Sequence, residues 1–153
     1  MKYLKRFNEL FEIFTYINEY NEYKEYIENG GDVNEIDYND NTMLIISIIN
    51  SYDDIFDYIL TLDNVDYSYT KPNGFNAFDF AIRQNSDKAL KLYSKMEDYA
   101  SHYLNKDYLL VSMKTNNEIK KSIFNNSLKI AKIYKPDLYK FIMKQQKMKK
   151  FNL

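Results

Sequence analysis

The side chains that most often perform catalysis or bind metals are scarce in this sequence. It has one histidine, His102, and no cysteine, so it can form neither a two-histidine zinc site nor a thiolate site. Its three glycines match neither GxGxxG nor GxxxxGK[ST], the loops that bind phosphates. His102 lies in the polar stretch ASHYLN, where we expect an exposed or helix-end side chain and not a general base. The sequence therefore predicts a protein that is not an enzyme and binds no cofactor.

Two groups of carboxylates resemble metal or acid–base sites at first sight. The segment DYNDN, which begins at Asp37, is similar to the start of a calcium loop but lacks its central glycine and closing glutamate. A tight turn accounts for these residues better, because Asp and Asn side chains bond to nearby backbone amides. Asp53 and Asp54 stand at an expected helix start, where they complement the helix dipole. We predict no metal site.

A lysine-rich segment near the end of the sequence is a different kind of candidate surface. Three of its lysines share one face of an expected helix, and Tyr139 and Phe151 lie nearby, a combination that can bind single-stranded nucleic acid. The chain has only two arginines, the residues that read bases best. The alternatives are an acidic or membrane surface as partner, or simply a solvated helix face. This alternative basic patch comprises Lys140, Lys144, Lys147, Lys149 and Lys150.

Length and composition indicate one folded domain, residues 1–153. Hydrophobic residues make up 45% of the chain, enough for a sizeable core. The beginning, MKYLKRFNELFEIF, has no apolar core of a secretory signal, and the longest apolar run, Met43–Ile49, is far below the roughly 20 residues that span a bilayer. We expect a cytoplasmic location, in the producing cell or in an infected host. Nineteen lysines against two arginines are typical of an AT-rich microbial or viral genome.

The charges are unevenly divided although the net charge is only −1. Residues 1–76 carry 15 acidic and 5 basic side chains, and residues 77–153 carry 7 acidic and 16 basic ones. Both halves could be ordinary solvated faces of one small domain. Alternatively, such a dipolar molecule could dock on a charged partner or associate with itself, because opposite charges steer association.

Apolar residues at helical spacing predict a succession of short helices separated by polar turns. Thr42 is expected to cap one of them and Asp87 another. Pro136 is expected to end one helix and begin the next. The predicted helices are two within Met1–Asn29, then Met43–Asn50, Asp53–Leu62, Asn76–Ala81, a helix from Asp87 to about Met96 with an extension over Asp98–Leu104, Tyr108–Lys114, Ile119–Ile133 and Asp137 to about Lys149.

One pattern occurs twice in the first half of the chain. GGDVNEIDYNDNTMLIIS runs from Gly30 to Ser47, and NVDYSYTKPNGFNAFDFA runs from Asn64 to Ala81. Equivalent residues are 34 positions apart, a period that indicates stacked repeats. The first copy resembles the ankyrin repeat, in which the inner helix usually begins TPLHxAA. The corresponding TMLIISI lacks the proline, the histidine and the alanines.

The ankyrin resemblance covers about residues 5–95 and implies an all-α fold. The expected architecture is a short ankyrin-type helical solenoid with β-turn fingers, followed by additional C-terminal helices. The single domain would then contain an N-terminal capping repeat over 5–36, a repeat over 37–69 and an ankyrin-like repeat over 70–97. Residues 98–153 would form a degenerate repeat or capping helices.

The resemblance also implies a function, because ankyrin proteins bind other proteins through their finger tips and the exposed side of their inner helices. The expected role is a non-enzymatic interaction module, for example a microbial or viral effector or inhibitor of a host protein. Tyr38 and Phe75 are the candidate hot spots, although Phe75 could instead pack only on the neighbouring finger. The alternatives are the basic patch, binding nucleic acid or an acidic surface, and charge-driven homo-oligomers. The partner-binding residues carried over are Tyr38, Asn39, Asn41, Ile49, Asn50, Pro72, Asn73, Phe75, Arg83 and Gln84.

Overall fold

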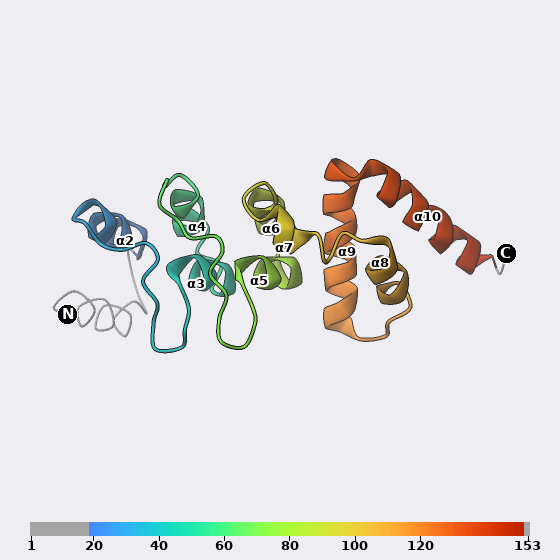
Figure 1. Cartoon of the computed structure of the whole chain (residues 1–153), viewed down its shortest axis with the longest axis horizontal. Helices are drawn as coiled ribbons and strands as arrows, with labels where there is room; N and C mark the ends of the chain where they lie inside the picture. The colour runs from blue at the N-terminus through green and yellow to red at the C-terminus, as the bar shows by residue number, and fades with distance from the viewer. Residues whose placement is uncertain (1–18, 152–153) are drawn as a thin grey trace. The chain divides into compact units, whose positions relative to one another are not determined.

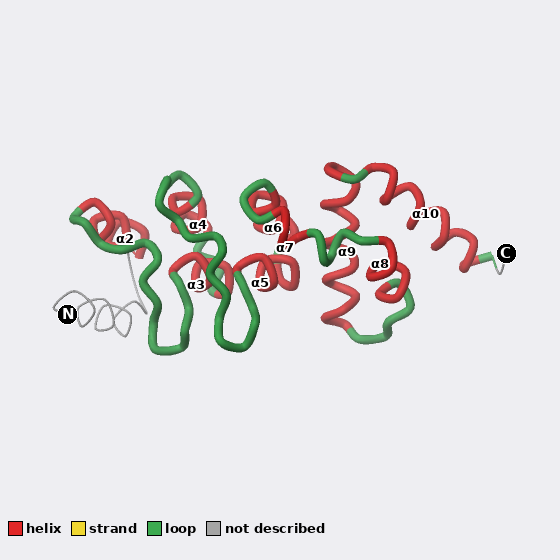
Figure 2. The backbone as a smooth tube through the Cα atoms, in the orientation of Figure 1, coloured by secondary structure: helices red, strands yellow, loops and turns green. Residues whose placement is uncertain are grey.

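The computed structural model describes residues 19–151, and all regular structure within them is helical. This part of the chain contains no strand (Figure 2). Its two single antiparallel bridges pair Ile36 with Thr42 and Thr70 with Asn76. The all-α prediction is therefore confirmed for these residues, and the first of the two helices expected in Met1–Asn29 lies outside them. The helices, labelled in Figure 1, are α2 (Glu19–Glu28), α3 (Met43–Ile49), α4 (Asp53–Ile59), α5 (Ala77–Gln84), α6 (Ser86–Tyr93), α7 (Glu97–Ala100), α8 (Lys106–Ser112), α9 (Glu118–Tyr134) and α10 (Pro136–Lys150).

The chain divides into two compact units, Met1–Ala77 and Phe78–Leu153. In the first unit, α4 packs against both α2 and α3. Six consecutive residues of α3, from Met43 to Ile48, are buried, because its sequence MLIISI has almost no polar side chain. Its one small polar residue, Ser47, is fully buried and donates to the Leu44 carbonyl at 2.7 Å, so burying the hydroxyl leaves no unsatisfied group.

Helix α4 has one buried side and one acidic side. Ile55, Phe56 and Ile59 are buried, whereas Asp53, Asp54 and Asp57 are exposed. The first two aspartates stand in the first turn, as expected for charges that complement the helix dipole. Aromatic edge-to-face contacts join this helix to α2 through Tyr58, whose ring centroid lies 6.0 Å from that of Tyr20 and 6.4 Å from that of Tyr23.

Most helix boundaries follow local capping chemistry. Thr42 caps α3 as predicted, with its hydroxyl accepting from the Ile45 amide at 3.3 Å. Pro136 occupies the first turn of α10, directly after the end of α9, as predicted. The prediction that Asp87 caps the next helix is wrong, because Asn85 accepts from the amides of Asp87 and Lys88, and Asp87 lies in the first turn, two residues after the cap.

In the second unit, α8, α9 and α10 pack around a small apolar cluster. Leu109, Phe124 and Ile142, one from each helix, are buried at its centre. The expected extension of the preceding helix over Asp98–Leu104 is replaced by the separate four-residue helix α7, which begins after Met96. The three predicted helices beyond it are present as α8, α9 and α10, with ends shifted by a few residues.

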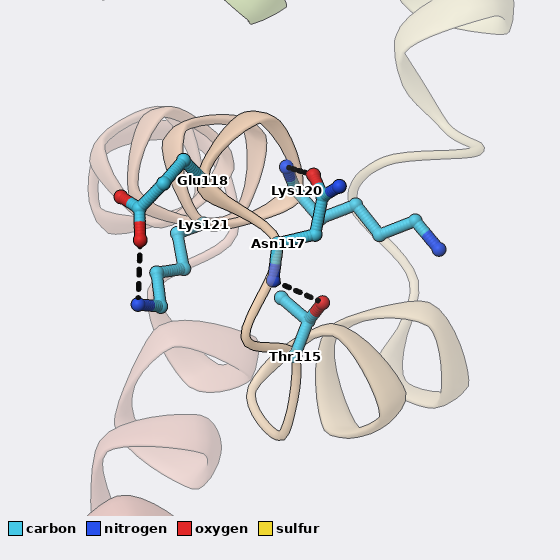
Figure 3. Close-up of polar contacts among 5 residues, drawn as sticks. All are labelled: Thr115, Asn117, Glu118, Lys120 and Lys121. Atoms are coloured by element: carbon cyan, nitrogen blue, oxygen red, sulfur yellow. Dashed lines mark hydrogen bonds and ion pairs between the residues drawn. The ribbon is translucent and has the colours of Figure 1, made fainter.

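The longest helix, α9, begins at a polar cap that Figure 3 shows in detail. The Asn117 side chain accepts from the Lys120 amide at 3.0 Å, and the Asn117 amide donates to the Thr115 hydroxyl at 3.2 Å (Figure 3). Lys121 and Glu118 form an ion pair at 2.9 Å in the first turn. These contacts satisfy amides that the helix itself leaves without partners.

Two side chains of α9 also donate hydrogen bonds to carbonyls at the C-terminal end of α5. Asn126, only 8% exposed, donates to the Ile82 carbonyl at 2.8 Å, and Ser122 donates to the Arg83 carbonyl at 3.1 Å. The last carbonyls of a helix have no partner within the helix. The two side chains therefore attach the 17-residue helix α9 to the C-terminal end of α5.

Candidate protein-binding site: the paired fingers

The first finger is a tight hairpin between α2 and α3. At its base the Asp37 amide donates to the Asn41 carbonyl at 2.9 Å, and at its tip the Asp40 amide donates to the Asp37 carbonyl at 3.1 Å. The buried Asp37 carboxylate accepts from the amides of Asn39 and Asn41, both at 2.8 Å. The DYNDN segment thus uses its first carboxylate to hold a turn, as the sequence predicted.

The second finger repeats this backbone pattern 34 residues later. The Lys71 amide donates to the Phe75 carbonyl at 2.8 Å, and the Gly74 amide donates to the Lys71 carbonyl at 2.8 Å. Gly74 has φ +85° where the first finger has Asp40 at φ +58°, so both tips turn through a left-handed residue. The second finger has Lys71 where the first has Asp37, and a lysine side chain cannot accept a backbone hydrogen bond. The Asn73 side chain stabilises this turn instead, accepting from the Phe75 amide at 3.1 Å.

Two side chains of the second finger bond directly to the first. The Tyr69 hydroxyl donates to the Asp40 carbonyl at 2.9 Å. The Lys71 ammonium donates to the Asn39 carbonyl at 2.9 Å and also to the Asn41 side-chain oxygen. A cation surrounded by oxygen acceptors makes stronger hydrogen bonds than a neutral donor would. The two fingers therefore form one connected element, which we call the paired fingers, residues 32–41 and 65–75.

The bases of the fingers are joined as well. The Asn34 side chain donates to the Asn64 carbonyl at 2.7 Å and accepts from the Asp66 amide at 2.7 Å. Asp32 and Asp66, 34 positions apart, each accept the amide two residues further on at 2.9 Å. The contacts of Asn34, Tyr69 and Lys71 were not anticipated from the sequence, because pairing between neighbouring turns depends on the register of their stacking and not on local turn chemistry.

The predicted partner-binding residues of the first unit lie on the paired fingers and at the end of α3. Tyr38 is 77% exposed and Ile49 is 40% exposed. Asn41 and Phe75 are half-buried, so Phe75 presents part of its ring to solvent while the rest is covered. The other predicted residues of this unit, Asn39, Asn50, Pro72 and Asn73, are exposed.

The remaining two predicted residues, Arg83 and Gln84, belong to the second unit. Both lie in the last turn of α5, where Gln84 is exposed and Arg83 is half-buried. The Ser122 contact with the Arg83 carbonyl orients this last turn. The alternative basic patch is also in the second unit, on α10, where all five of its lysines are exposed.

The first unit is acidic around its fingers. Residues 19–77 contain 13 Asp and Glu residues and two lysines. Lys24 pairs with Glu28 at 3.7 Å, and Lys71 is held between the fingers. Behind the first finger, Tyr26 donates to Glu35 at 2.5 Å, and burial together with this bond raises the pKa of Tyr26 to about 12. Burial likewise raises the pKa of Tyr69, whose hydroxyl bonds the first finger.

The single histidine lies apart from the paired fingers in the sequence. His102 is exposed, and its ring contacts those of Tyr103 and Tyr108, with centroids 5.1 and 5.0 Å away. Among residues 19–151, no group of three or more His, Cys, Asp or Glu side chains is placed to hold a metal ion. No helix in the described part of the chain is long and apolar enough to cross a membrane.

Comparisons with protein-family models, with curated proteins and with solved structures found no match for this chain. What can be said of its function therefore rests on its own residues and contacts.

Proposed function

We propose that this chain is an ankyrin-type interaction module that binds a partner protein through the paired fingers and the exposed end of α3. The observation that carries the proposal is the recurrence of the finger hydrogen bonds at 34-residue spacing, from the base pair of each hairpin to its left-handed tip. Each finger is followed by a short buried helix that begins at an equivalent position, Met43 or Ala77. Repetition of this kind supports a stacked-repeat architecture.

The contacts between the fingers favour binding over a purely structural role for these loops. Loops that are fixed before a partner arrives lose less conformational freedom on binding, which improves affinity. Here Tyr69 and Lys71 fix the first finger while Tyr38 and Pro72 remain exposed beside them in sequence. An exposed tyrosine on a rigid support is a favourable interface anchor, because it offers a large contact area with few rotatable bonds.

The expected partner is a protein and not a small substrate. The lysine-rich, arginine-poor composition supports a microbial or viral origin and, with it, a cytoplasmic host protein as the target of an effector or inhibitor. No convergent histidine, cysteine or glycine-rich loop argues for a reaction. A non-enzymatic role therefore fits the residues best.

The deciding experiment is affinity capture from a lysate of the cells in which the protein occurs, at 50 mM and 500 mM salt. Wild type is compared with the Tyr38→Ala/Phe75→Ala double variant and with Val111→Ala, a matched truncation of a side chain that is 74% exposed in the second unit. The expected result is a defined protein band, kept at high salt by wild type and by Val111→Ala and lost by the double variant. With the purified partner, each finger truncation should cost about 2 kcal/mol of binding if it is central.

Equal capture by all three variants would contradict the finger site. Material that is released by salt from all three alike would point to charge-driven binding instead. Because Phe75 is half-buried, a thermal melt of the double variant is needed to separate loss of binding from loss of folding.

A further inference from the structure

The last long helix, α10, has two unlike sides. Its apolar side is used inside the second unit, where Ile142 is fully buried and Leu138 and Phe141 pack, half-buried, against the cluster that includes Leu109 and Phe124. The centre of this apolar side is therefore engaged inside the unit, while Met148, near the end of the helix, is 38% exposed.

The opposite side of α10 is a row of lysines. Lys140, Lys144 and Lys147 are spaced four and three residues apart, which makes them neighbours on one helical face, and all three are exposed. Phe151 follows Lys140 by 11 residues, close to three helical turns, so it continues the same face and is 66% exposed. Lys149 and Lys150 extend the positive charge at the end of the helix.

These lysines have one acidic neighbour in their own helix, Asp137, three residues before Lys140, and none of them pairs with it. Within residues 19–151 no ion pair involves any of the five, whereas Lys24 and Lys121 elsewhere in the chain pair with glutamates on their own helices. The only acidic residue of α10 is Asp137, in the first turn. The positive face is therefore available to an external anion.

Helix electrostatics explain only part of this arrangement. Lysines in the last turn stabilise the negative end of a helix, which accounts for Lys147, Lys149 and Lys150. That effect fades beyond the final turn, so it does not account for Lys140 and Lys144 near the middle. Lys140 and Lys144 therefore form a positive surface that the helix dipole does not explain.

The chemistry of the face distinguishes between possible anionic partners. A membrane-surface helix needs a continuous apolar stripe to insert, and the stripe of α10 instead packs inside the unit, with Ile142 buried and Leu138 and Phe141 half-buried. Single-stranded nucleic acid needs cations for its phosphates and an aromatic ring on which a base stacks, and the lysine row with Phe151 offers both. The row from Lys140 to Lys147 spans about 10 Å along the helix. No arginine lies in α10, so base-specific reading is not expected.

We propose that this face of α10, formed by Lys140, Lys144, Lys147 and Phe151, binds single-stranded nucleic acid without sequence preference. The lysines contact phosphates and Phe151 stacks on a base. This site is separate from the paired fingers, which belong to the other unit. Its test therefore does not depend on whether the fingers bind a protein.

The test measures binding of a dye-labelled 20-nucleotide oligothymidylate by fluorescence anisotropy between 50 and 300 mM salt. The variants are Lys140→Gln/Lys144→Gln/Lys147→Gln and, as a matched loss of three charges, Lys91→Gln/Lys95→Gln/Lys114→Gln, whose lysines are exposed elsewhere in the second unit. We expect the α10 variant to bind at least about tenfold more weakly, with the slope of log K against log salt shallower by about 2, since each single-strand phosphate contact contributes roughly 0.7. The control should change affinity by less than about threefold.

Phe151→Ala tests the aromatic part of the site. We expect about tenfold weaker binding of the oligothymidylate and no change for heparin, which has negative charge but no bases. Tyr38→Ala should leave oligothymidylate binding unchanged, because it lies on the paired fingers.

Four results would overturn the proposal. The first is no binding of the oligothymidylate at 50 mM salt, and the second is an equal loss of affinity in the two triple variants. The third is tighter binding of vesicles containing 30% phosphatidylserine than of the oligothymidylate. The fourth is that polyglutamate competes for the protein as well as the oligothymidylate does and that Phe151→Ala has no effect. The third would assign the face to a membrane, and the fourth to an acidic protein surface. Circular dichroism melts of every variant confirm that the compared proteins are folded.

Discussion

The two left-handed residues at the finger tips differ in chemistry but not in role. Asp40 and Gly74, 34 positions apart, have φ values of +58° and +85°. Glycine adopts this region without penalty, and aspartate tolerates it better than most side chains. A Cβ placed on Gly74 would meet no atom within 4 Å, so any cost of a side chain there comes from the backbone alone.

Substitution of Gly74 should therefore follow backbone preference and not size. We expect Gly74→Ala to lower the free energy of unfolding by about 1 kcal/mol. Gly74→Asp should cost less despite its larger side chain, because the first finger already holds an aspartate in this conformation. Urea unfolding of the three proteins measures both differences, and a greater loss for aspartate than for alanine would contradict the backbone explanation.

A single residue, Tyr26, also makes the folding stability depend on pH. Burial first, and then its hydrogen bond to Glu35, raise its pKa to about 12, against about 10 in an unfolded chain. Between pH 10 and pH 12 the unfolded state loses this proton first, so the contribution to stability is complete below pH 10 and declines as the pH rises to 12. Tyr26→Phe should show a smaller decline than wild type over this window in denaturant unfolding.

Tyr38→Phe is the matched control for that measurement, since its side chain is 77% exposed. It should decline with pH as wild type does. If Tyr26→Phe also kept the full wild-type decline, the buried hydroxyl at position 26 would not be its source.

At the scale of elements, polar side chains decide how helices and loops are attached. Asn126 and its neighbour Asn125 are chemically identical, but only Asn126 is buried and bonded, to the last turn of α5. Asn126 is thus one of the two side chains, with Ser122, that join α9 to the end of α5. Its partner, the Ile82 carbonyl, depends on this bond because it lies at a helix end.

Asn126→Ala should lower the free energy of unfolding by about 1–3 kcal/mol, since it leaves a buried carbonyl without its donor. Asn125→Ala, on the exposed side, should change it by less than about 0.5 kcal/mol. Thermal or denaturant unfolding followed by circular dichroism compares the two. Similar effects of both substitutions would show that the contact with α5 contributes little.

Lys71 has the corresponding role between the fingers. Lys71→Met keeps most of the side-chain volume but removes the ammonium group that bonds Asn39 and Asn41. We expect faster amide hydrogen exchange at Asp40 and Asn41 and an affinity for the finger partner reduced by about three- to tenfold through lost pre-organisation. Unchanged exchange in the first finger would mean that the hairpin is rigid without its neighbour.

At the scale of the whole molecule, charge is divided between the two units. Residues 1–77 carry 15 acidic and 5 basic side chains, and residues 78–153 carry 7 and 16. A net charge of −1 therefore conceals two strong and opposite fields, which act on partners over about 10 Å at 0.1 M salt.

This division predicts salt-sensitive self-association, through the acidic unit of one copy and the basic unit of another. Sedimentation equilibrium at 20 mM salt should give a weight-average mass above the 18.5 kDa of one chain, falling to 18.5 kDa at 300 mM. The Lys140→Gln/Lys144→Gln/Lys147→Gln variant should need less salt to become monomeric. A mass of 18.5 kDa at both salt concentrations would exclude charge-driven oligomers.

The sequence by itself determined the local features of this protein. Apolar spacing and capping residues predicted the described helices apart from the separate α7, including the start at Thr42 and the break at Pro136, because such signals act over one or two turns. It also located the two finger turns and the lysine row of α10, which depend on residue type and local spacing.

Only the tertiary structure decided which of these local features touch. The hydrogen bonds from Lys71 to the first finger and from Asn126 to α5 join residues 30 to 44 positions apart. Two adjacent asparagines look alike in the sequence, and no local signal there shows that Lys71 contacts the neighbouring finger. Their roles differ because burial and partner geometry arise only when separate elements pack together.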